Sequence, residues 1–224
     1  MENYIDNITE KELTAAKDAF FFKYQKDWFA GRKAQGTSRT RFLMLSRQIG
    51  SSAYFVFEAL EDAVLTGNDQ IFISPTDTAG EALNGFVKMF SRDYFKRELT
   101  GDKTIKLSNG ASIYFLSETC KTYGALAGNV YIQDAAYLKN FTKTWAIARG
   151  ISMLEKHSRT LFTARNPHNK AVEALWLNDD DDIWRQTTTI DDAIDDSCHL
   201  LDKPELQEHF SPAEFALHFM CKYN

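Results

Sequence analysis

Short apolar runs alternate with amphipathic stretches along most of the chain. Short apolar runs between turn signals are typical of buried strands, and apolar residues that recur every three or four positions are typical of helices. We expect strands at residues 42–45, 70–74, 130–132, 158–163 and 184–190. We expect helices from the Thr9–Glu12 capping box to about Tyr24 and at residues 53–64, 79–97, 142–154, 170–177 and 211–222. Strands alternating with helices predict an α/β fold with a mostly parallel central sheet flanked by helices.

Two segments depart from this alternation. Residues 104–107 and 111–116 flank Ser108-Asn109-Gly110 and predict a β-hairpin, because Asn-Gly is the strongest short hairpin signal. Residues 31–41 are expected to form a loop, since Gly31 and Gly36 interrupt any periodicity. Four consecutive aspartates at 179–182 predict a solvated acidic loop, because like charges in a run repel one another.

Composition sets limits on the class of protein. The chain has 224 residues, of which 44% are hydrophobic, so it can fill a core and is not wholly disordered. Its net charge of −5 argues against a uniformly basic nucleic-acid coat but leaves a local basic patch open. Three scattered cysteines without a C-x-x-C pair argue against a zinc ribbon or a disulfide scaffold. No apolar run approaches the ~20 residues of a membrane helix, so we expect no membrane partner and a soluble, intracellular chain.

One turn between an expected strand and an expected helix carries candidate chemistry. Residues 45–52 read Leu-Ser-Arg-Gln-Ile-Gly-Ser-Ser, which matches the phosphate-loop pattern G-x-x-x-x-G-K-[ST] at Gly50 and Ser52. Glycine lets the backbone approach a phosphate, and the N-terminus of the following helix attracts anions. The lysine of the pattern is missing, since Leu45 and Ser51 stand at the two positions that could supply it. Taken alone, this half-match also fits a generic strand–turn–helix connection.

The order of motifs along the chain resembles the ATPase domain of the large terminase subunits of tailed phages, which are DNA-packaging motors. The likeness covers about residues 15–224 and is strongest with the branch whose loop reads K-S-R-Q-x-G-[AS]-[ST]. Residues 24–29 look like the adenine-recognising segment Y-Q-x-x-W-F of that family. The other stretches that carry the likeness are residues 46–52, 54–55, 58–60, 70–74, 128–134, 159–163, 166–167, 184–186, 191–193 and 215–221.

The resemblance implies a P-loop NTPase fold of the RecA/ASCE type, with ATP and Mg²⁺ as cofactors. It implies one domain over residues 1–224: an N-terminal helix and adenine-side segment at 1–40, a core at 41–190, and a C-terminal helical segment at 191–224, beyond which a nuclease domain follows in the family. The implied partners are double-stranded DNA held through its backbone, a small terminase subunit, a portal and further copies of the chain. The implied location is the cytoplasm of a bacterial host.

The resemblance also assigns roles to residues. Asp134 and Gln133 occupy the acidic-strand position and become the catalytic candidates, and Ser52 and Asp134 become the Mg²⁺ ligands. Coupling of hydrolysis to movement would fall to three residues after the next strand: Thr163, Arg165 and Asn166. Nucleotide binding would fall to Gln25, Ser46, Arg47, Gln48, Gly50, Ser51 and Ser52.

The departures from the family fall on the chemistry. Neither Leu45 nor Ser51 supplies the phosphate-binding lysine, and the expected Asp-Glu pair reads Gln133-Asp134. Either Asp134 slips into the metal-side position or the site is degenerate, and both weaken hydrolysis. Losing one such charge typically costs ~10²–10³ in rate. The alternatives are therefore a catalytically weak, nuclease-less homologue that acts as a binding or interference module, and an unrelated nucleotide-binding α/β protein.

Two further expectations concern position. The strand before Ser46 and the strand that ends near Gln133 are expected to be neighbours in the sheet, with their carboxyl ends at one crevice. Four basic residues precede the first strand and are expected on the surface, either as ordinary solubilising charges or as a patch that faces DNA or a neighbour: Arg32, Lys33, Arg39 and Arg41.

Overall fold

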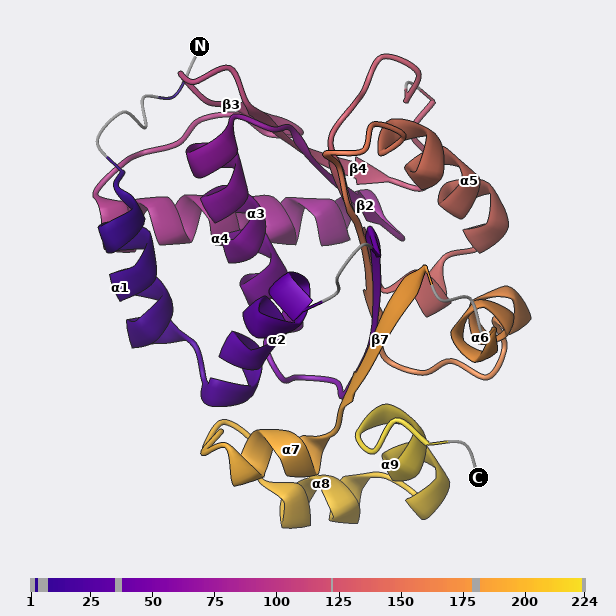
Figure 1. Ribbon diagram of the computed structural model, residues 1–224. Helices are drawn as coiled ribbons and strands as arrows, with labels where there is room; N and C mark the ends of the chain where they lie inside the picture. The colour runs from indigo at the N-terminus through magenta and orange to yellow at the C-terminus, as the bar shows by residue number, and fades with distance from the viewer. Residues whose placement is uncertain (1–2, 4–7, 35–37, 122, 179–181, 223–224) are drawn as a thin grey trace.

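A computed structural model describes residues 3, 8–34, 38–121, 123–178 and 182–222, without the side chains of residues 32–34. The described residues form one seven-stranded sheet with helices on both faces (Figure 1). The strands are β1 Thr40–Leu45, β2 Gln70–Ser74, β3 Thr104–Lys106, β4 Ser112–Ser117, β5 Asn129–Gln133, β6 Arg159–Thr163 and β7 Ile183–Thr188. The helices are α1 Glu10–Phe20, α2 Lys23–Ala34, α3 Ser51–Thr66, α4 Asp77–Phe95, the 3-10 turn η1 Ala135–Tyr137, α5 Phe141–Ile151, α6 Lys170–Leu177, α7 Ile190–Asp195, α8 Lys203–His209 and α9 Pro212–His218.

The sheet has the strand order β3-β4-β2-β5-β6-β1-β7, and all neighbouring pairs are parallel except the β3–β4 hairpin. The mostly parallel sheet and the hairpin are therefore confirmed. The expected adjacency of β1 and β5 is wrong, because β6 pairs with both and lies between them. All three strands are parallel, so their carboxyl ends still meet at one edge of the sheet.

Helices α1 to α4 cover one face of the sheet, α5 and α6 cover the other, and α7 to α9 lie beyond the end of β7 (Figure 1). The expected first helix is two helices, because Phe21 is extended and α2 starts at Lys23. Helix α2 then continues through Gly31 to Ala34, where a loop was expected. Gly31 packs on the Trp184 ring so closely that a Cβ would lie 2.5 Å from it. Long-range packing thus overrides a local breaker signal.

Arg41 is not part of a surface patch. Its guanidinium forms a buried ion pair with Glu58, and these two side chains are 2% and 0% exposed. The hydroxyls of Tyr54 and Tyr131 donate to the same carboxylate at 3.1 and 3.2 Å, and Arg41 donates to Thr160 Oγ1 at 2.9 Å. The pair is tolerated in the core because it is hydrogen-bonded on all sides. It links β1, α3, β5 and β6.

Among the other basic residues that precede β1, Arg39 is half-buried and donates to backbone carbonyls. The side chains of Arg32 and Lys33 lie outside the described residues, as do residues 179–181 of the acidic run.

Candidate nucleotide site

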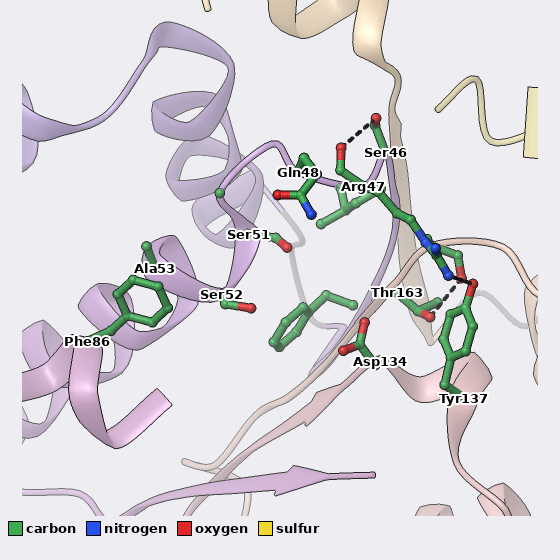
Figure 2. A pocket seen from close by; sticks show the side chains of 14 residues that line it. Ser46, Arg47, Gln48, Ser51, Ser52, Ala53, Phe86, Asp134, Tyr137 and Thr163 are labelled. Carbon is green, nitrogen blue, oxygen red and sulfur yellow. Dashed lines mark hydrogen bonds between the residues drawn. The ribbon is translucent and has the colours of Figure 1, made fainter. Parts of the chain in front are cut away.

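A pocket of about 520 Å³ opens at the carboxyl edge of the sheet, where the loop after β1 faces the residues that follow β5 and β6 (Figure 2). It brings together Asp134, Thr163 and six of the loop residues that the sequence predicts for nucleotide binding. The lining residues are Leu45, Ser46, Arg47, Gln48, Gly50, Ser51, Ser52, Ala53, Phe86, Asp134, Tyr137, Phe162, Thr163 and Ala164.

The loop owes its shape to two residues with left-handed backbone. Gln48 has a φ of 63° and Gly50 a φ of 74°, and Gly50 is the N-cap of α3. Glycine adopts this conformation without steric cost, whereas Gln48 is strained. No side chain caps α3, so the first N–H groups of this 16-residue helix point toward the pocket side without a capping acceptor. A helix start of this kind is suited to an anion such as a phosphate group.

Gln25 lies behind the loop and does not line the pocket. Its amide nitrogen donates to Ile49 O at 3.1 Å and Gly50 O at 3.4 Å, and its Oε1 accepts from the N–H of Phe22 at 3.0 Å. The side chain is 4% exposed. In this structure Gln25 supports the loop backbone, while its contact with adenine stays a prediction.

Arg47 is the one basic residue among those that line the pocket. Its guanidinium donates to the Tyr137 hydroxyl at 2.8 Å (Figure 2). That hydroxyl donates in turn to Arg165 O at 3.0 Å. The backbone N–H of Arg47 donates to His218 O at 2.9 Å. Tyr137 was not predicted from the sequence, because a lone tyrosine one turn after Asp134 carries no motif.

Gln133 is the last residue of β5 and is 7% exposed. Its Oε1 accepts from Ser74 Oγ at 2.8 Å, and its Nε2 donates to Ser52 Oγ at 3.2 Å. The amide therefore fills the space between the loop and β2, and it turns a donor toward the serine expected to bind Mg²⁺. Gln133 thus lies directly beside the serine that is expected to bind Mg²⁺.

Asp134 lines the pocket from the opposite side to the loop. It has a left-handed φ of 48° at the start of η1, and Figure 2 shows its carboxylate directed into the same space as the Ser52 hydroxyl. Burial raises the pKa of Asp134, and the nearby positive charge of Arg47 opposes that rise. A carboxyl group whose pKa is raised by burial suits either proton transfer or binding of a cation.

The three predicted coupling residues are placed differently. Thr163 is 2% exposed, and its hydroxyl accepts from the N–H of Ala136 at 3.1 Å, so it ties β6 to the turn after β5. Arg165 and Asn166 do not line the pocket. Arg165 pairs with Glu173 at 3.3 Å, and Asn166 donates to Ala136 O at 2.9 Å. Both support the wall formed by η1.

The oxygen donors of the pocket suit Mg²⁺ only in part. Ser52 and Asp134 offer a hydroxyl and a carboxylate, which is a set that Mg²⁺ accepts when phosphate oxygens complete its coordination. Within the described part of the chain, no group of three or more His, Cys, Asp or Glu side chains could hold a metal ion alone. No described helix is long and apolar enough to cross a membrane.

Several known proteins resemble this chain in sequence and in fold. The family model described as "Terminase large subunit, T4likevirus-type, N-terminal" matches residues 42–223. The chain is 28% identical to the "Probable terminase, ATPase subunit" of Haemophilus phage HP1 over 99% of its own length, and it spans 40% of that relative. The HK97 bacteriophage large terminase superposes with a TM-score of 0.71 at 11% identity, over 91% of this chain and 50% of that one. The large terminase of the thermophilic bacteriophage D6E, in complex with ATP-gamma-S, gives 0.68 at 16% identity over 91% and 53%. These matches confirm the P-loop NTPase fold.

Proposed function

The chain belongs to the terminase large-subunit family, and we propose that it is an ATP-binding domain of a DNA-packaging motor. The observation that carries the proposal is the pocket itself. An uncapped helix start, a glycine with a φ of 74° and a half-buried carboxylate converge at the carboxyl edge of a parallel sheet. This edge is where open α/β sheets bind ligands. The HP1 relative is named an ATPase subunit, and the D6E structure holds a nucleotide analogue.

The phosphates of the nucleotide would lie against the loop, at the N–H groups of Ser51 and Ser52. Arg47 supplies the only positive side chain among the lining residues, so it would contact a terminal phosphate in place of the missing lysine. Its hydrogen bond to Tyr137 keeps the guanidinium over the pocket. Mg²⁺, which neutralises phosphate charge when bound, would be held by the Ser52 hydroxyl and the Asp134 carboxylate.

Hydrolysis in this site is expected to be slow. Leu45 puts an apolar side chain where the family has its phosphate-binding lysine. The oxygen and the nitrogen of the Gln133 amide are both hydrogen-bonded, to Ser74 and to Ser52. These contacts favour the second candidate function, a homologue that binds nucleotide and packaging proteins with little turnover. In the first candidate, double-stranded DNA, a small terminase subunit and a portal would be the partners, in the cytoplasm of a bacterial host.

Calorimetric titration with ATP-gamma-S and Mg²⁺, beside a phosphate-release assay with ATP, tests the proposal. We expect saturable binding by the natural chain and about tenfold weaker binding by Arg47→Ala, since one charged phosphate contact is lost. Arg92→Ala on α4 removes the same charge from an exposed position and serves as the matched control. Absence of binding by the natural chain, or equal binding by Arg47→Ala, would contradict the proposal.

A further inference from the structure

A second pocket, of about 430 Å³, lies at the edge of the sheet opposite to the nucleotide site. Its lining residues, which we call the arginine pocket, are Arg39, Ala146, Arg149, Gly150, Met153 and Arg159. Arg39 directly precedes β1, Arg159 is the first residue of β6, and Arg149 is in the last turn of α5. The two strands whose carboxyl ends build the nucleotide site thus carry arginines at their amino ends.

Among the described residues, no ion pair neutralises the positive charge of this pocket. Arg39 donates to the carbonyl of Leu154 at 2.7 Å, and Arg159 donates to Thr40 Oγ1 at 3.0 Å. No carboxylate is found among the described residues that line the pocket. Burial lowers the pKa of Arg159, and the positive charges of Arg39 and Arg149 lower it further, with Asp182 acting in the opposite sense. Three guanidinium groups therefore crowd together, and an added anion would relieve their repulsion.

The exposed face of α5 extends the same charge. The helix contains no Asp or Glu, and its exposed positions include Lys143, Ala146, Arg149 and Gly150. Residues 139–159 hold five Lys and Arg but one Glu, in a chain whose net charge is −5. A Cβ added at Gly150 would meet nothing within 4 Å, so a bulky anion can approach the helix closely.

We infer that the arginine pocket and the exposed face of α5 bind the phosphodiester backbone of double-stranded DNA. The inference rests on the proposed function, because it supplies the surface by which such a motor holds its substrate. Contacts between guanidinium groups and phosphates carry no sequence information, which suits a protein that moves DNA of any sequence. A net negative chain repels DNA elsewhere, so a local basic surface determines how the duplex lies. Exposed Met153 beside the pocket suits a protein partner as well, and the experiment separates the two.

Fluorescence anisotropy with two unrelated duplexes of about 30 base pairs, between about 50 and about 200 mM salt, tests the inference. The variant is Arg149→Ala, since Arg149 is exposed and makes no hydrogen bond within the described residues. We expect binding of both duplexes to weaken equally, by about five- to tenfold at 0.1 M salt, with the log–log salt slope reduced by about one. Lys11→Ala removes an equal charge from an exposed position of α1 and should leave the duplex affinity and the salt slope unchanged.

Nucleotide titration of the same preparations distinguishes the two proposals. Arg149→Ala should bind ATP-gamma-S as the natural chain does, because the arginine pocket lies at the other edge of the sheet. Natural chain that binds duplex through Arg149 but binds no nucleotide would overturn the proposed function and support this inference. Duplex affinity and salt slope unchanged in both Arg149→Ala and Arg149→Glu would overturn the inference. The inference would also be overturned if the natural chain bound no duplex and instead bound a poly-glutamate peptide in a way that depends on Arg149.

Discussion

Three single residues with left-handed backbone shape the nucleotide site: Gln48, Gly50 and Asp134. Such positions cost about 1–3 kcal/mol in a non-glycine residue and persist where the surrounding structure fixes them. Gln48 and Gly50 turn the loop away from β1, and Asp134 turns its carboxylate into the pocket. The strain is thus concentrated where ligand contacts are made.

At Gly50 this geometry gives a direct test. A Cβ at position 50 would lie 2.7 Å from Gln25 Nε2. A substituted residue would also have to adopt the left-handed φ of Gly50. Gly50→Val should therefore cost about 1–2 kcal/mol of unfolding free energy and lower ATP-gamma-S affinity by at least about tenfold. Gly85→Ala is the matched control: Gly85 is an exposed position of α4 with open space around it, so alanine there should stabilise by up to about 1 kcal/mol. Unchanged nucleotide affinity in Gly50→Val would remove the loop from the site.

The carboxyl group of Asp134 should make stability depend on pH. Its pKa is raised by burial above the ordinary value of 3.8, so the folded protein holds the proton more tightly than the unfolded chain. Stability from this group is present below pH 3.8 and is lost as pH rises through the raised pKa. Asp134→Asn should therefore melt at a higher temperature than the natural chain near neutral pH, with the difference shrinking in acid. A difference in melting temperature that is constant with pH would contradict this account.

At the scale of elements, the buried Arg41–Glu58 pair fixes α3 against β1, and the phosphate loop runs from the end of β1 to the start of α3. Removing one partner leaves an uncompensated charge in the core, so Arg41→Met should destabilise the protein by about 3–5 kcal/mol in urea unfolding. The double variant Arg41→Met with Glu58→Leu should recover most of that loss, because two apolar side chains of similar size can replace a buried pair. Equal instability of the single and double variants would show that the hydroxyls of Tyr54 and Tyr131 depend on the charge.

At the scale of the whole molecule, C-terminal residues contact the loop of the nucleotide site and the segment after β6. His218 O accepts from the N–H of Arg47, and Cys221 O accepts from Arg165 at 2.5 Å. The residues around α9 thus contact both the loop and one of the predicted coupling residues.

The rate of ATP hydrolysis depends on several residues of the site together. Leu45 lines the pocket from the end of β1, so Leu45→Lys would point its charge toward bound phosphate. Together with Gln133→Asp and Asp134→Glu it rebuilds the charges that the family pattern expects. We expect slow ATP hydrolysis by the natural chain and a gain of at least about tenfold in the triple variant, since each recovered charge contributes roughly 1.4 kcal/mol or more to lowering the barrier. The same triple variant with Leu45→Met in place of Leu45→Lys controls for the change of volume.

Fast hydrolysis by the natural chain that Arg47→Ala abolishes would mean that Arg47 and Asp134 have replaced the missing groups. That result would reject the binding-module alternative. No turnover in either protein, with tight binding to another packaging protein, would support it.

Most elements and the loop after β1 follow from local signals in the sequence. Helical periodicity, apolar runs and Asn-Gly are local signals, and they placed β2 at Gln70–Ser74, α6 at Lys170–Leu177 and the β3–β4 hairpin as the structure has them. Gly50 before a helical pattern likewise marked the start of α3, where it is the N-cap. These features depend on residues a few positions apart, where backbone sterics and hydrogen bonding act directly.

The order of the strands and the partners of the side chains depend on contacts between distant parts of the chain. Sequence spacing does not show that β6 lies between β1 and β5, that Gln25 holds the loop from behind, or that Tyr137 binds Arg47 across 90 positions. The buried Arg41–Glu58 pair and the arginine pocket have the same origin. Each forms because burial removes water from groups that are distant in the chain, and the cost of leaving them unpaired then selects one arrangement.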